Sequence, residues 1–150
     1  MAMLKTTTSI VMKIRFKKKR LYANLIIGIV WTLLGIYSLL EDDNLRWSDY
    51  GYLIIGLLYI GHYLYDLTTQ YLTIENGSIR KNGLYGFGKK INLNDIYWIK
   101  KFASDYILKT KTEELKINTE LIDKNSLNEL NAILEKLNLP ANKTPFTSAI

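Results

Sequence analysis

Two long apolar segments dominate the first half of the chain. Residues 21–40 carry no charged side chain, and a helix of about twenty residues spans about 30 Å, the thickness of the hydrocarbon core of a bilayer. Residues 50–65 also lack acids, lysine and arginine, and their aromatic ends extend this segment into the membrane interface. The pattern predicts a transmembrane helical hairpin over residues 21–67, with helices at 21–40 and 50–67.

A buried helical hairpin of a soluble protein is the alternative explanation for these segments. A helix on the surface of a soluble protein has a polar face, whereas apolar residues point all round the first predicted helix. This set comprises Ile26, Ile27, Ile29, Val30, Leu33, Leu34 and Ile36. A cleaved signal peptide fits poorly, because the run is long, begins late and is not followed by a small-residue cleavage site. The membrane hairpin is therefore the preferred interpretation.

Residues 68–140 are predicted to form a small α+β domain. Polar residues alternate with β-branched and aromatic ones, which is typical of half-buried strands. Asn76-Gly77 is a strong hairpin signal, because a type I′ turn needs positive φ at both positions. Farther on, the period becomes helical, with Ser126 and Glu129 as a capping box and Pro140 as the stop signal. The expected strands are residues 70–75, 78–81, 89–93, 96–102, 106–110 and 115–118, and the apolar helix face comprises Leu127, Leu130, Ile133, Leu134 and Leu137.

Three segments of this part resemble the bacterial pleckstrin-homology-like domains. They are YLTIENGSIR (71–80), KKINLNDIYWIKK (89–101) and NSLNELNAILEKL (125–137). Many proteins of that type carry two transmembrane helices just before the domain. The resemblance implies an α+β membrane protein, in which a two-helix transmembrane hairpin precedes a small antiparallel partial β-barrel closed by a C-terminal helix. It brings no catalytic residues, and the Asn76-Gly77 loop lacks the bases by which phosphoinositide-binding relatives hold their ligand.

Charge is distributed unevenly along the chain. The net charge is +6, yet residues 1–20 hold seven basic groups and no acid, whereas residues 41–49 hold four acids and one base. Because cytoplasmic flanks of membrane helices are rich in lysine and arginine, we expect a multi-pass protein of the plasma membrane with both termini in the cytoplasm. Residues 1–20 are then a basic cytoplasmic arm and residues 141–150 a flexible tail. Met1 and Met12 are both candidates for the natural start.

The composition argues against an enzyme. The chain has no cysteine and one histidine, so no thiolate nucleophile, cysteine metal site or Ser-His-Asp arrangement is expected. We therefore expect no catalytic residue, metal or cofactor. The single histidine, His62, is expected to be structural and to pair with Asp66 one helical turn later. Nucleic-acid binding is also not expected, because the residues after position 70 carry a net charge of only +3, too little for a basic face.

Three groups of residues are candidate sites. The basic run before the first helix is expected to set the topology and to contact anionic lipid headgroups. Small residues in both helices are expected to allow close approach, within the hairpin or between copies. Aromatic and basic residues of a glycine-rich loop are expected to form a plain connection or to dip into the membrane interface. The basic run comprises Lys13, Arg15, Lys17, Lys18, Lys19 and Arg20. The small residues are Gly28, Thr32, Gly35 and Gly56, and the loop residues are Tyr85, Phe87, Lys89 and Lys90.

The sequence thus predicts a non-enzymatic integral membrane protein. Its cytoplasmic domain is expected to bind a protein partner, or copies of itself, at exposed strand edges and in a hydrophobic groove beside the C-terminal helix. The alternative is a membrane-embedded immunity or regulatory protein that acts against a toxin or bacteriocin.

Overall fold

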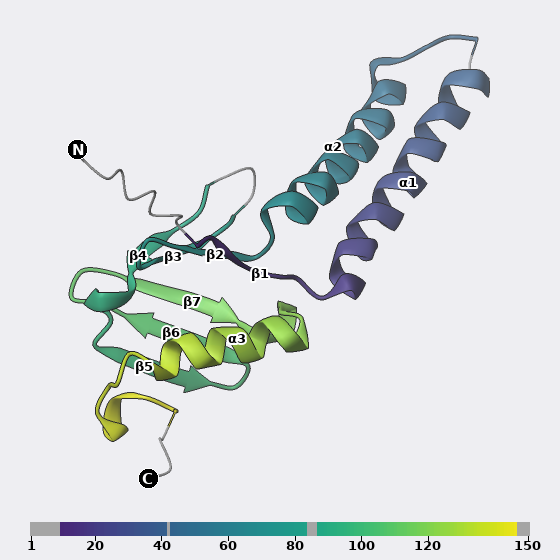
Figure 1. The fold of residues 1–150 in the computed structure, drawn as a ribbon. Helices are drawn as coiled ribbons and strands as arrows, with labels where there is room; N and C mark the ends of the chain where they lie inside the picture. The colour runs from purple at the N-terminus through teal and green to yellow at the C-terminus, as the bar shows by residue number, and fades with distance from the viewer. Residues whose placement is uncertain (1–9, 42, 84–86, 147–150) are drawn as a thin grey trace, which may run out of the picture.

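The computed structural model describes residues 10–41, 43–83 and 87–146 (Figure 1). Two long helices project away from a body made of short strands and a third helix. The described elements are β1 (Met12–Ile14), α1 (Lys18–Glu41), α2 (Trp47–Thr69), β2 (Leu72–Glu75), β3 (Ser78–Lys81), β4 (Lys90–Asn92), β5 (Trp98–Phe102), β6 (Asp105–Lys109), β7 (Glu114–Asn118) and α3 (Lys124–Glu135). We call the body formed by β1–β7 and α3 the sheet domain.

Helices α1 and α2 lie side by side in opposite directions (Figure 1). Most large apolar side chains of both helices are exposed, among them Leu33, Leu40 and Leu57. Their exposure follows from the sequence, because apolar residues occupy every side of each helix while each helix covers only one side of the other. The helix pair is therefore a large apolar projection.

The transmembrane hairpin predicted over residues 21–67 is wrong as stated. Of the helices described, only α1 is long and apolar enough to cross a membrane. The second helix contains five tyrosines, His62 and two aspartates, and these polar groups lower its mean hydropathy. A helical hairpin is present, but only one of its helices has the composition of a membrane span.

Strands β1 to β4 form one antiparallel sheet in the order β1-β2-β3-β4. The predicted Asn76-Gly77 turn joins β2 to β3 and is confirmed, with φ of 50° at Asn76 and 71° at Gly77. The edge strand β1 comes from the segment predicted to be a basic arm, and Ile14 pairs with Leu72 of β2. The sheet domain therefore begins before α1, and the helix pair is inserted between its first two strands.

Strands β5 to β7 form a second antiparallel sheet in the order β5-β6-β7, and α3 lies across it (Figure 1). The helix begins earlier than predicted, because the side chain of Asp123 accepts a hydrogen bond from Asn125 N and caps it. Ser126, predicted as the cap, is instead buried within the first turns.

The single partial barrel expected from the resemblance is also wrong for the described residues. The chain makes a short 3-10 turn at Leu93–Asp95 after β4, so that β5 starts a new sheet. The core lies between the two sheets and α3, and its fully buried side chains are Ile14, Leu72, Ile79, Ile99, Leu108, Leu115, Ile117, Ile122, Leu130 and Leu134. Burial of about ten aliphatic side chains, at about 1.5–3 kcal/mol each, is the main force holding the sheets together.

Candidate functional site

The predicted small residues all lie at the contact between α1 and α2. A Cβ atom added to Gly28 would come within 2.8 Å of Ile60 Cγ1, and one on Gly35 within 2.7 Å of Leu53 N. Gly56 faces Thr32 in the same way, with Thr32 N only 2.6 Å from a Cβ atom at position 56. Glycine at these positions lets the two backbones approach closely. The structure thus brings Gly28, Thr32, Gly35 and Gly56 together within one chain.

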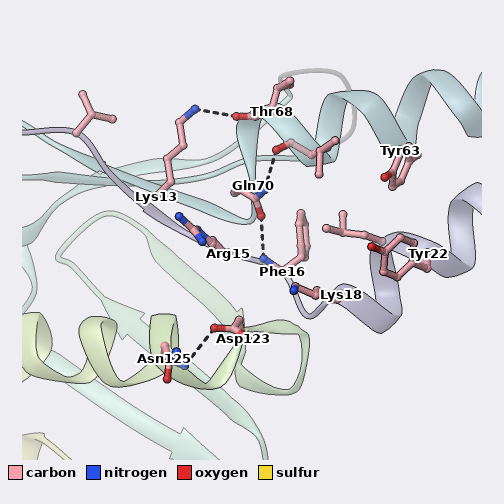
Figure 2. A pocket seen from close by; sticks show the side chains of 13 residues that line it. Lys13, Arg15, Phe16, Lys18, Tyr22, Tyr63, Thr68, Gln70, Asp123 and Asn125 are labelled. Carbon is pink, nitrogen blue, oxygen red and sulfur yellow. Dashed lines mark hydrogen bonds between the residues drawn. The ribbon is translucent and has the colours of Figure 1, made fainter.

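A cavity of about 880 Å³ opens where the helix pair meets the sheet domain (Figure 2). We call it the junction pocket. Its walls come from β1, from the first turn of α1, from the last turns of α2 and from the start of α3. The end of α2 is fixed there by Gln70, whose Oε1 accepts a hydrogen bond from Phe16 N at 3.0 Å and whose Nε2 donates to Leu67 O at 2.7 Å.

Three of the six predicted basic residues line the junction pocket: Lys13, Arg15 and Lys18. Lys13 Nζ donates a hydrogen bond to Thr68 O at 2.7 Å, which ties β1 to the last turn of α2. Asp123 is the one acid among the described lining residues, and one of its oxygens is occupied by Asn125 N at the start of α3. The charged side chains of the pocket therefore carry an excess of positive charge.

The other three predicted basic residues have different surroundings. Lys17 is anchored through its backbone, where its N–H donates to Leu121 O at 2.8 Å. The guanidinium of Arg20 lies 4.2 Å from the centroid of the Phe16 ring, a cation–π geometry. Lys19 is exposed on the first turn of α1. The basic run is thus split between the pocket, the underlying core and open surface.

His62 pairs with Asp66, as the sequence predicts. His62 Nε2 lies 3.4 Å from Asp66 Oδ2, and Asp66 is buried. The pair stands on α2 close to the sheet domain. Within the described residues there is no group of three or more histidine and acidic side chains able to hold a metal ion.

A second surface of interest is the outer side of the β5-β6-β7 sheet. Trp98, Lys100 and Phe102 alternate along β5, and the register places Lys109 opposite Trp98 and Ile107 opposite Lys100. The next strand places Lys116 opposite Ile107. We call Trp98, Lys100, Phe102, Ile107, Lys109 and Lys116 the β5 face. Phe102 is 72% exposed there, and Lys100 Nζ lies 4.2 Å from the centroid of the Trp98 ring.

The two sheets are joined by a polar contact between Lys81 and Lys116. Lys81 Nζ donates to Lys116 O at 2.8 Å, and burial lowers the pKa of Lys81. Tyr71 is beside it, and its hydroxyl accepts a hydrogen bond from Asn118 N at 2.9 Å. Burial raises the pKa of Tyr71. Lys116 itself pairs with Asp105 at 2.9 Å, and this hydrogen bond raises the pKa of Lys116.

The predicted interface loop is only partly described. Tyr85 lies outside the described residues, whereas Phe87 and Lys89 are exposed and Lys90 begins β4. Lys89 O accepts a hydrogen bond from Lys81 N at 2.8 Å. These residues are not part of the junction pocket or of the β5 face.

Sequence reasoning missed several residues of both surfaces. Tyr63, Gln70 and Asp123 line the junction pocket from segments that are distant in the chain. Local sequence patterns do not predict tertiary contacts of this kind. Ile107 lies in the strand predicted at residues 106–110, where the sequence does not single it out. Alternation along β5 and β6 was only a partial signal. It places Trp98, Phe102 and Ile107 on one side and Ile99 and Leu108 on the other, but it does not identify which side is buried.

No family model, curated protein or solved structure matches this chain. The resemblance to pleckstrin-homology-like domains therefore stays a prediction.

Proposed function

We propose that this chain is a non-enzymatic membrane protein whose sheet domain docks a protein partner, or another copy of the chain, at the β5 face. Helix α1 attaches the protein to the membrane. The sheet domain lies on the cytoplasmic side of the plasma membrane. The observation that carries this function is the exposed Phe102 on the edge strand β5, beside the half-buried Trp98.

The attachment is supported by the surface of α1. This helix is long and apolar enough to cross a membrane, and its exposed side chains include Ile26, Leu33 and Leu40. In water such a surface is unfavourable, at roughly 25 cal/mol for each Å² of exposed apolar area. In a bilayer the same side chains are solvated by lipid.

The orientation is supported by the basic residues at the N-terminal end of α1. Lys17, Lys18, Lys19 and Arg20 are adjacent to the apolar run, and such clusters are retained on the cytoplasmic side. The sheet domain joins α1 at this same end (Figure 1). It is therefore expected on the cytoplasmic side as well.

Docking is supported by the chemistry of the β5 face. Trp98, Phe102 and Ile107 alternate with lysines on this face. Lys109 pairs with Glu114 and Lys116 pairs with Asp105, whereas Lys100 lies over the Trp98 ring. Interfaces are enriched in aromatic anchors with a polar rim, and an edge strand such as β5 can accept a further strand. This pattern favours a partner segment with apolar side chains and an acid placed to meet Lys100.

Site-specific photo-crosslinking in the native membrane tests the proposed docking. A photoreactive amino acid replaces Phe102 in the full chain, and the matched control replaces the exposed Asn128 of α3. We expect a discrete cross-linked product from position 102 only, and we expect Lys100→Glu to weaken it by repelling an acidic segment. The mass of the product distinguishes a second copy from another protein. Absence of a product, or the same products from both positions, would contradict docking at this face.

A further inference from the structure

The junction pocket lies at the height where lipid headgroups meet an embedded helix. Its walls include Leu21 and Leu67 from the start of α1 and the end of α2. They also include Tyr22 and Tyr63, which Figure 2 shows on the two helices. Leu21 is also the first residue of the charge-free run 21–40. With α1 in the membrane, as proposed above, the pocket is level with the headgroups on the side of the sheet domain.

The donors of the pocket suit a phosphate group. Lys13 lines the pocket from β1, and Arg15 lines it from the position directly after this strand. Lys18 lines it from the first turn of α1. Lysine and arginine are the side chains that bind phosphate most strongly, through charge-assisted hydrogen bonds. Asp123 opposes them with a single negative charge. The balance of charge in the pocket therefore favours an anion.

The apolar part of the pocket favours a phosphate group that carries acyl chains. Leu21 and Leu67 line the cavity together with the rings of Tyr22 and Tyr63. Tyrosine at this position is typical of the membrane interface, where the ring contacts hydrocarbon and the hydroxyl contacts water. Beyond the pocket, exposed apolar surface continues along α1 from Tyr22 through residues such as Ile26. A soluble phosphate compound would leave this surface unused.

We propose that the junction pocket binds the headgroup phosphate of one anionic phospholipid through Lys13, Arg15 and Lys18. The site rests on the membrane attachment proposed above and adds to it a defined ligand position. A run of exposed bases attracts any anionic surface, with each base acting independently. Binding in a pocket depends instead on the particular bases that line it. Here these are Lys13, Arg15 and Lys18, whereas Lys17 and Lys19 do not line the pocket.

Two double variants with equal loss of charge separate these two kinds of binding. Arg15→Gln/Lys18→Gln removes two cations of the pocket, and Lys17→Gln/Lys19→Gln removes two exposed neighbours from the same stretch that do not line it. Lys13 is kept in both, since its hydrogen bond to Thr68 O supports the fold. The full chain, stripped of lipid in mild detergent, is titrated with phosphatidylglycerol or phosphatidylcholine, and bound lipid is counted by native mass spectrometry.

We expect one phosphatidylglycerol to bind at least about tenfold more tightly than phosphatidylcholine, and the pocket variant to lose this preference while the control keeps it. Equal losses in the two variants, or no preference in the unmodified chain, would overturn the site. Glycerol 3-phosphate is added as a soluble competitor. Displacement of the lipid by an equal concentration of glycerol 3-phosphate would overturn the assignment to a lipid, because the acyl chains would then contribute nothing.

Failure of this site is distinguishable from failure of the proposed attachment. A chain that floats with vesicles but shows no lipid preference contradicts the site alone. A chain that does not float with vesicles of either composition contradicts the attachment itself.

Discussion

At the scale of single residues, Gly56 is in close contact with Thr32 of the neighbouring helix. A Cβ atom at this position would lie 2.6 Å from Thr32 N and 2.9 Å from Thr32 Cα. These are backbone atoms of the neighbouring helix, so relief requires the two helices to move apart. At Gly51 on the same helix, a Cβ atom would meet none of the described atoms within 4 Å.

We predict that Gly56→Ala lowers the free energy of unfolding of the helix pair by about 1–3 kcal/mol, the usual effect of overpacking. Gly51→Ala is the matched control, and it is expected to be neutral or to stabilise by up to about 1 kcal/mol through helix propensity. Unfolding is followed by circular dichroism as SDS is titrated into the protein in mild detergent. Equal stabilities for the two variants would contradict the close contact at Gly56.

Tyr71 links the two sheets through a buried hydroxyl. Its OH accepts a hydrogen bond from Asn118 N, and burial raises its pKa above the ordinary value of 10.0. A group whose pKa is raised by folding contributes stability that is complete below its unfolded pKa and is lost as the pH rises through the folded value. The sheet domain should therefore lose stability above about pH 10.

Tyr71→Phe tests this pH dependence. At neutral pH the variant should be about 1–3 kcal/mol less stable in urea unfolding, because Asn118 N–H loses its acceptor. Above about pH 10 the difference from the unmodified protein should shrink, because the variant has no phenol to ionise at this position. A difference that stays constant from neutral to alkaline pH would rule out a contribution from Tyr71 ionisation.

At the scale of elements, β1 connects the basic N-terminal segment to the core. Ile14 pairs with Leu72 and its side chain is fully buried. Ile14→Ala should destabilise the sheet domain by about 2–5 kcal/mol. Val11→Ala, nearby in the chain and 46% exposed, should change the stability by less than about 0.5 kcal/mol. Thermal unfolding of the two variants in detergent measures both, and similar melting temperatures would contradict a structural role for β1.

The elements differ in how far the sequence predicted them. The Asn76-Gly77 hairpin and α3 were found because each has a local signal, namely a turn dipeptide and a helical period. The strand β1 was missed, since three residues with a charge in the middle show no periodicity. The inner side of β5 was not predicted: Ile99 is the buried residue of this strand, whereas Trp98 and Phe102 lie on its opposite side. Both sides of β5 carry apolar residues, so alternation alone does not identify the inner side.

At the scale of the whole molecule, the two candidate surfaces depend on contacts between distant segments. The basic residues of the junction pocket were predicted as a charged run. The contact of β1, α1, α2 and Asp123 that forms the pocket was not predicted. Such a meeting is set by tertiary packing, for example the pairing of Ile14 with Leu72 across the whole inserted helix pair. A single sequence does not report these contacts.

The insertion of α1 and α2 between β1 and β2 makes the helix pair removable. Because β1 and β2 are antiparallel neighbours, a flexible linker of about six residues can join residue 17 to residue 70 in place of the helices. This shortened chain, residues 10–17 linked to 70–146, should be soluble and unfold cooperatively. Residues 70–146 alone should not, because the loss of β1 exposes the edge of β2. Identical behaviour of the two fragments in urea unfolding would contradict the role assigned to β1.

Flotation on a density gradient tests most directly whether α1 attaches a separate sheet domain to the membrane. The full chain and the linked chain lacking residues 18–69 are each mixed with vesicles of phosphatidylcholine and phosphatidylglycerol and washed with alkaline carbonate. We predict that the full chain floats with the vesicles after the wash, while the linked chain stays in the soluble fraction as a folded protein. A full chain that remains soluble and monomeric without vesicles or detergent would contradict the attachment.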